Sequence, residues 1–68
     1  MSTHYQFYRE RASEARRDAG QTSLQNVRDR CLRAAAAWEQ MAARVERTDR
    51  MRAEAEAKKA AAALAAVE

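Results

Sequence analysis

Apolar residues recur every three or four positions through the middle of the chain. They form one stripe: Leu24, Val27, Cys31, Ala34, Trp38, Met41 and Val45, followed by Thr48. Alternating steps of three and four place these side chains on one face of a helix, the spacing of a helix that packs against partner helices. No proline or glycine interrupts the pattern. It predicts a long helix over about residues 23–66.

A shorter stripe with the same spacing precedes it. Its members are Tyr5, Tyr8, Ala12, Ala15 and Ala19. They predict a first helix over about residues 4–19, and Thr3 with Gln6 matches the capping-box pattern that often begins a helix.

Residues 20–22 are the predicted connection. Gly20 tolerates the left-handed backbone that commonly ends a helix. Thr22 with Gln25 repeats the capping-box pattern and predicts the start of the second helix. Two helices joined by so few residues must turn back on each other, so the predicted fold is an all-α helical hairpin with a short first helix and a long second helix.

A turn at this place also predicts which residues face each other. Tyr8 is expected opposite Ala34 and Ala35, and Tyr5 opposite Trp38, where the two rings would form an aromatic pair. The first helix then extends along the second helix only as far as about position 40.

The second helix continues far beyond that point, in a segment of strong helix formers. A weaker stripe recurs there at Ala57, Ala60, Leu64 and Val67. We therefore expect a second copy to cover the overhang, in a homodimeric four-helix bundle that is parallel or antiparallel. The predicted core and dimer interface comprise Tyr5, Tyr8, Leu24, Val27, Cys31, Trp38, Met41 and Val45. The alanine-rich end, over about residues 56–68, is expected to fray.

Size and cysteine content support an oligomer in a reducing compartment. A folded chain of 68 residues buries only roughly 60% of the surface that its unfolded form exposes, so a monomer is marginal. The single cysteine, Cys31, cannot form an internal disulfide. No stretch resembles a signal peptide, and the longest uncharged run, Ala60 to Val67, is too short to span a membrane. We expect a cytoplasmic protein that does not enter membranes.

The net charge of +3 is concentrated in the first half of the chain. Arg9, Arg16, Arg30 and Arg33 are candidate nucleic-acid contacts, and Phe7 lies off the stripe, where it could stack on a base. Interleaved acidic residues weaken the field of these arginines. A small basic dimeric hairpin that binds RNA or DNA is therefore the alternative function.

Catalytic and metal-site chemistry has little support. His4 and Cys31 fall short of the three or four ligands that a zinc site needs. Glu10, Glu14 and Asp18 follow one helix face, but arginines are interleaved with them, as on a solvated charged face. We therefore expect no catalytic residues, no cofactor, no metal and no enzymatic activity.

Two further apolar residues, Phe7 and Leu32, lie outside the stripes and are candidates for a protein-partner surface. The predicted function is thus a small non-catalytic helical interaction or assembly protein that acts through self-association and a protein partner. A membrane-surface role for the C-terminal segment ranks lowest, because large apolar anchors are missing there.

Three segments together suggest a resemblance. They are Tyr8-Arg9-Glu10-Arg11-Ala12, Val27-Arg28-Asp29-Arg30-Cys31 and Trp38-Glu39-Gln40-Met41-Ala42. Over about residues 5–47 the chain resembles very short bacterial helical-hairpin proteins of unknown function, with a Tyr-x-x-Arg-Ala helix followed by a Trp-x-x-Met/Leu-Ala helix. It departs from them in lacking a proline in the connection and in its longer alanine-rich extension. The resemblance implies the hairpin and no activity.

Overall fold

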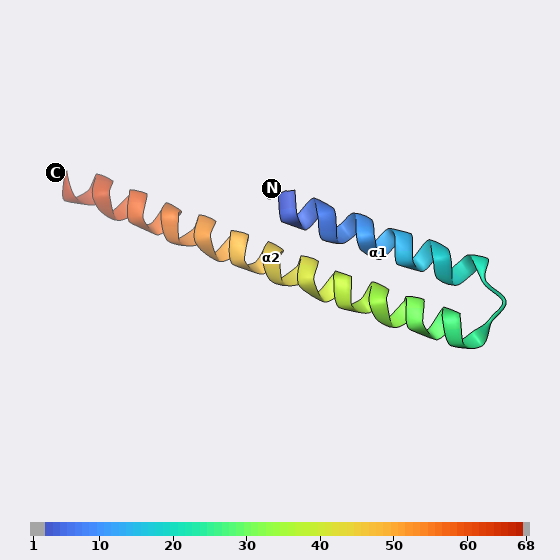
Figure 1. Cartoon of the computed structure of the whole chain (residues 1–68). Coiled ribbons are helices and arrows are strands. Elements are labelled where there is room, and N and C mark those ends of the chain that lie inside the picture. Colours follow the sequence, from blue (N-terminus) through green and yellow to red (C-terminus); the bar gives the residue numbers. More distant parts are fainter. Residues whose placement is uncertain (1–2, 68) are drawn as a thin grey trace.

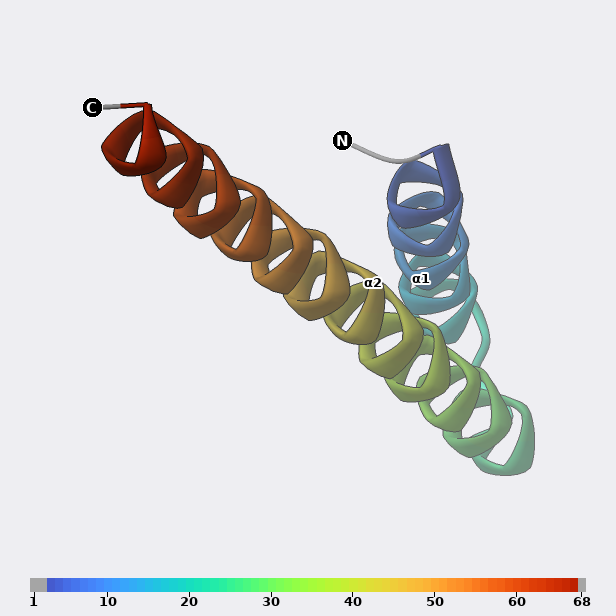
Figure 2. The same ribbon diagram turned by 90° about the vertical axis from the view of Figure 1, so that its left-hand side faces the viewer.

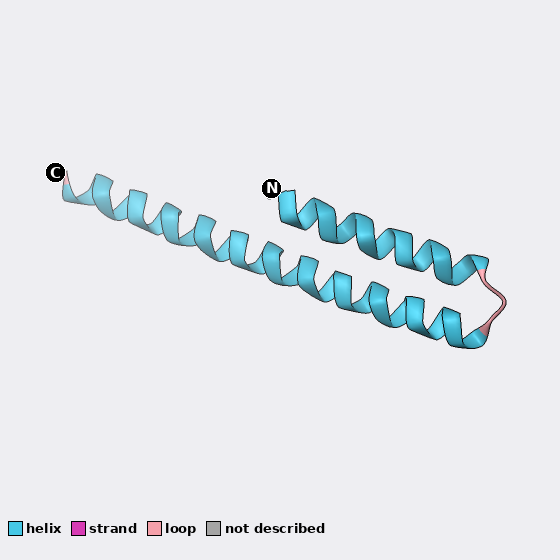
Figure 3. Cartoon of the chain, in the orientation of Figure 1, coloured by secondary structure: helices cyan, strands magenta, loops and turns pink. Residues whose placement is uncertain are grey.

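The computed structural model describes residues 3–67 as two antiparallel helices (Figure 1). Helix α1 spans Thr3–Gln21 and helix α2 spans Gln25–Ala66. A three-residue connection joins them, and residues 3–67 contain no strand (Figure 3). The predicted all-α hairpin, with a short first helix and a long second helix, is confirmed.

The connection differs from the predicted one. Gly20 is helical, without a positive φ, and the turn comes later, with Leu24 in an extended conformation. The Thr22 hydroxyl accepts a hydrogen bond from the Leu24 N–H at 3.2 Å, and the Arg28 guanidinium donates to the Thr22 carbonyl at 3.0 Å. These bonds pair the Leu24 N–H and the Thr22 carbonyl at the turn. The turn therefore uses neither a left-handed glycine nor the second capping box. Both local predictions were wrong.

Four alanines form the contact line between the helices, which we call the seam. Ala12 and Ala19 of α1 and Ala35 and Ala42 of α2 are each at most 4% exposed. The two residues of each pair are two helical turns apart, and side chains this small let the helix backbones approach closely. Among residues 3–67 no larger side chain is fully buried.

The seam of α2 is rotated from the predicted stripe. Ala34, which the stripe places in the core, is exposed, whereas its neighbour Ala35 is completely buried. At 100° per residue, the line through Ala35 and Ala42 lies about 70° from the middle of the predicted stripe. Thr48, at the end of that stripe, is exposed. Close backbone packing on alanine thus displaces the larger apolar side chains to one side of the contact.

The pairing along the helices is also shifted. Tyr8 stacks on Trp38, with ring centroids 5.9 Å apart, rather than on Ala34 and Ala35. At the open end of the hairpin, His4 lies beside Asp49 and Arg52, well beyond position 40. The cause is the later turn: α1 continues to Gln21, so Tyr8 and His4 meet later residues of α2 than the predicted turn would give them.

The molecule is a rod. Its dimensions are 67 × 15 × 11 Å and its radius of gyration is 18.8 Å, whereas a compact chain of this length has a radius of about 11 Å. Helix α2 continues far past the beginning of α1 (Figure 2), and residues 51–67 are all exposed. The helix continues to Ala66, and fraying of its last turns stays a prediction. Neither helix has the length and apolarity needed to cross a membrane within residues 3–67.

Candidate interaction surface

The larger apolar side chains gather on one side of the seam. We call this surface the Trp38 face, and it comprises Phe7, Tyr8, Val27, Cys31, Trp38, Met41 and Val45. Phe7 is 49% exposed and the other six are half-buried. The helical angles of these positions place them on the same edge of both helices. The hairpin alone therefore leaves its largest apolar groups partly in water.

An aromatic cluster lies near the centre of this face. The Trp38 ring stacks on Tyr8 at an interplanar angle of 29° and meets Phe7 edge to face, at 89° with centroids 5.9 Å apart. The Arg11 guanidinium lies over Trp38, 5.4 Å from the ring centroid. Pairs of this geometry contribute about 0.5–1.5 kcal/mol each beyond their buried area. The cluster fixes the shape of the face, and it includes Phe7, which the sequence placed outside the core.

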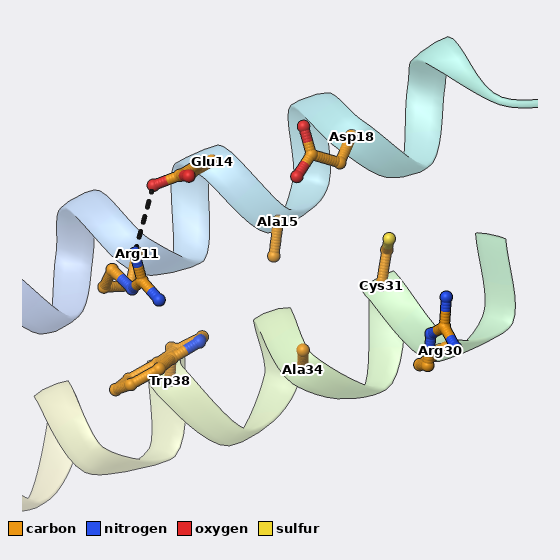
Figure 4. Close-up of a pocket in the computed structure, with 8 residues that line it drawn as sticks. All are labelled: Arg11, Glu14, Ala15, Asp18, Arg30, Cys31, Ala34 and Trp38. Carbon is orange, nitrogen blue, oxygen red and sulfur yellow. Dashed lines mark ion pairs between the residues drawn. The ribbon is translucent and has the colours of Figure 1, made fainter. Parts of the chain in front are cut away.

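A hollow of about 230 Å³ adjoins the cluster (Figure 4). Cys31 and Trp38 point from α2 toward α1 there, and Ala15 and Ala34 complete its apolar wall. Its charged lining residues are two cations and two anions: Arg11, Arg30, Glu14 and Asp18. Arg11 and Glu14 form an ion pair at 3.6 Å. The lining of this hollow therefore carries both signs of charge in equal number.

The opposite side of the seam is polar and holds the ion pair between the two helices. Arg16 donates two hydrogen bonds of 2.7 Å to the two carboxylate oxygens of Glu39. These bonds hold the pKa of Glu39 below its usual value and raise the pKa of Arg16. The positive charge of Arg9 lowers the pKa of Glu39 further. A bidentate contact of this kind requires a specific geometry, so it favours one register of α1 on α2.

The candidate nucleic-acid residues do not converge on one strip. Arg16 is engaged with Glu39 on the polar side, and Arg30 lines the hollow of the Trp38 face. Arg9 lies in a shallow depression along α1 that Glu10 and other acidic residues also line. Arg33 is exposed on α2. The structure therefore spreads these charges over different sides of the hairpin.

The remaining predicted residues take varied positions. Tyr5 is half-buried, Leu32 is 40% exposed, and Leu24 is 63% exposed because it belongs to the turn rather than to the contact between the helices. An intermolecular role for Leu24 stays a prediction. Within residues 3–67 no group of three histidine, cysteine or acidic side chains is placed to hold a metal ion.

Sequence reasoning placed Ala35 opposite Tyr8 but left Ala35 and Ala42, which form the seam on α2, out of the predicted core. A signal for them existed, since alanines recur seven residues apart in both helices. No protein-family model, curated protein or solved structure matches this chain. Its function is therefore inferred from the contacts and charges of its own residues.

Proposed function

We propose that the chain is a small, non-catalytic helical assembly protein that associates with a second copy of itself through the Trp38 face. The observation that carries this proposal is the one-sided arrangement of seven apolar side chains, none of which the hairpin buries completely. Burying such a side chain completely is worth about 1.5–3 kcal/mol relative to full exposure. About half of that gain remains for a partner to supply at Phe7, which is 49% exposed, and a smaller share remains at each of the other six side chains.

The size of the face suits a modest homodimer. Helix α1, with 19 residues, is about 28 Å long, and two adjacent helices are about 20 Å wide. The footprint of about 600 Å² lies at the lower end of what stable interfaces bury on each partner. A second hairpin could therefore cover the Trp38 face without any contribution from the rest of α2.

The charges around the face favour a second copy over a polyanion. A two-fold contact brings the margin of one hairpin against the margin of another. Arg11 and Arg30 can then approach Glu14 and Asp18 of the second copy, and the combined charge is balanced. A nucleic acid bound at the same place would lie beside Glu14 and Asp18 as well as beside Arg11 and Arg30. The two acidic residues would repel its phosphates and so oppose binding.

The proposal also includes a protein partner, for which Phe7 and Leu32 were the candidate contacts. Leu32 is 40% exposed and lies away from the Trp38 face, whereas Phe7 packs against Trp38 and belongs to the face itself. A cytoplasmic location and membership in the group of short bacterial hairpin proteins are likewise proposed from the sequence alone.

The test is the molar mass in solution, measured by light scattering over a concentration series for Trp38→Ala and for Leu32→Ala. We expect Trp38→Ala to lower both the mass and the helix content, because it removes the centre of the aromatic cluster. Leu32→Ala removes an apolar group elsewhere and should leave the mass unchanged. A Trp38→Ala protein with the mass and melting temperature of the wild type would refute the proposal.

The same proteins test the alternative function. A basic hairpin that binds RNA or DNA would show an affinity that falls steeply with salt. We expect no binding even at low salt. Steeply salt-dependent binding that Arg30→Gln and Arg33→Gln weaken would favour the alternative.

A further inference from the structure

The side of α2 that faces away from α1 carries a row of positive charges, which we call the outer stripe. At 100° per residue, these cations lie within about 50° of the direction opposite to Ala35 and Ala42. All of them are exposed, and the ion pairs within residues 3–67 involve none of them. The cations of the outer stripe are Arg30, Arg33, Arg44, Arg47 and Lys58.

The acidic residues of α2 lie mostly on other sides of the helix. Asp29 is the one acid of α2 within the same 50°, and it is half-buried near the turn, where it accepts a hydrogen bond from Gln25 at 2.8 Å. The others lie at least about 70° from the middle of the outer stripe; they are Glu39, Glu46, Asp49, Glu54 and Glu56. The stripe therefore presents positive charge over about 42 Å of the helix with little to neutralise it.

The cations of the outer stripe recur at a regular interval. Arg30, Arg44 and Lys58 are fourteen residues apart, and so are Arg33 and Arg47. Fourteen residues are two heptads, after which a helix that packs against another helix presents nearly the same face. The three groups of cations therefore follow one line at intervals of about 21 Å. A helix lying along α2 can reach all of them.

The positions between these groups are uncharged and partly apolar. Ala37 and Gln40 lie between the first two groups of cations, and Met51 and Ala55 lie between the last two. Met51 is 64% exposed, and the hairpin cannot cover it because α1 lies on the other side of α2 (Figure 1). Cations that alternate with apolar positions suit a helix in which carboxylates alternate with apolar side chains.

We propose that the outer stripe binds an acidic amphipathic helix of a partner protein. This helix lies along α2, with carboxylates facing the groups of cations and apolar side chains facing Ala37 and Met51. An arginine can hold a carboxylate through two parallel hydrogen bonds, which favours one register. The proposal goes beyond self-association through the Trp38 face, and it rests on the protein partner that the proposed function includes.

A second copy and a nucleic acid match the outer stripe less well. In α1, Glu10, Glu14 and Asp18 span only about 12 Å, and arginines are interleaved with them, so α1 of a second copy can meet only one group of cations. A nucleic acid carries a charge every few ångströms along its length, whereas the outer stripe has stretches of about 16 Å without a cation. Phosphates also offer no apolar group that could bury Met51.

The probe is a synthetic helical peptide of alanine, leucine and glutamate, as long as the 42 residues of α2. Its glutamates recur in pairs every fourteen residues, the interval of the stripe, and its leucines lie between the pairs on the same face. A second peptide of the same composition has its glutamates on the face opposite the leucines. Fluorescence anisotropy of the labelled peptides at low salt measures their affinity. We expect the second peptide to bind about tenfold more weakly, and equal affinities would overturn the proposal.

Two pairs of variants locate the binding site. Arg44→Gln and Arg50→Gln each remove one positive charge, but Arg50 is paired with Glu46 and lies about 110° from the middle of the outer stripe. Met51→Ala and Leu64→Ala each shorten an exposed apolar side chain, and Leu64 lies about 150° from the middle of the stripe. We expect Arg44→Gln and Met51→Ala to weaken binding of the first peptide about three- to tenfold, and the two controls to change it less than about twofold.

Three results would overturn the proposal. Equal losses from Arg44→Gln and Arg50→Gln would show that only the net charge matters. Loss of binding in Phe7→Ala, with none in Arg44→Gln, would place the peptide on the Trp38 face. A single-stranded oligonucleotide that binds more tightly than the peptide, with an affinity that Met51→Ala leaves unchanged, would replace the protein partner by a polyanion.

These measurements are independent of self-association. Failure of the contact through the Trp38 face appears in the molar mass of Trp38→Ala, whereas failure of the outer stripe appears in the affinity of the peptide. Circular dichroism should show the same helix content for the variants at positions 44, 50, 51 and 64, so that a change in affinity reports the contact itself.

Discussion

The seam can be tested at two adjacent alanines. The apolar stripe in the sequence points to Ala34 as a core residue, whereas the structure buries Ala35 completely and leaves Ala34 exposed. Ala34→Leu and Ala35→Leu add the same atoms one residue apart. They therefore distinguish the two orientations of α2 about its own axis.

The expected effects differ in sign and size. Leucine at position 35 adds three carbon atoms where the side chain is 0% exposed and alanines hold the helices close together. Overpacking of this kind costs about 1–3 kcal/mol. In a domain of this size each kcal/mol shifts the melting temperature by about 4–8 °C, so the loss should be about 4–24 °C. Leucine at position 34 meets no such restriction and adds apolar surface beside Cys31 and Trp38, so that protein should be as stable as the wild type or more so.

Thermal and urea unfolding, followed by circular dichroism, measure the difference. Both variants and the wild type must be compared at one protein concentration, because self-association contributes to apparent stability. The assignment of the seam would be refuted if Ala34→Leu were the destabilised protein and Ala35→Leu were neutral. That result would restore the stripe expected from the sequence.

The other expectations concern the polar side of the hairpin and the aromatic cluster. Since Arg16 holds the pKa of Glu39 below its ordinary value of 4.5, the ion pair stabilises the fold above that pH, and the contribution is lost as the pH falls through the lower pKa of the folded state. Unfolding at pH 7 and near pH 3 should show a small, salt-screened loss in the wild type that Glu39→Gln lacks, and equal pH dependence in both would contradict the ion pair. Phe7→Ala should shift the fluorescence of Trp38 toward that of an exposed indole and cost more than the about 0.5–1.5 kcal/mol of a single aromatic pair, because the buried half of the ring is also lost, whereas Leu32→Ala should leave the emission unchanged. No spectral difference between these two variants would place Phe7 outside the cluster.

Much of the interaction surface could be predicted from local pattern. The steps of three and four that include Trp38, Met41 and Val45 identify one face of a helix from their spacing alone, and these residues are half-buried on the Trp38 face. The membership of Phe7 could not be found in this way. Its position lies off the stripe of α1, and only the packing of α1 on α2 brings its ring against Trp38.

The ion pair between Arg16 and Glu39 was likewise beyond sequence reasoning. The two residues lie 23 positions apart, and either could have paired with other charged neighbours. Their contact depends on where the turn falls, at which Thr22 and Arg28 form hydrogen bonds, and on the rotation of α2 about its own axis, which follows from close packing on Ala35 and Ala42.

The amino-acid sequence by itself determined that this protein is two helices of unequal length joined by a short turn. Periodicity and helix propensity act within a few residues, so they can be recognised without knowledge of the fold. The tertiary structure decided which face of α2 meets α1. Two faces of α2 were apolar enough to pack, one with large side chains and one with alanine. Close approach of the backbones selected Ala35 and Ala42 for the seam, and it left Trp38 and its neighbours on a surface that another molecule can cover.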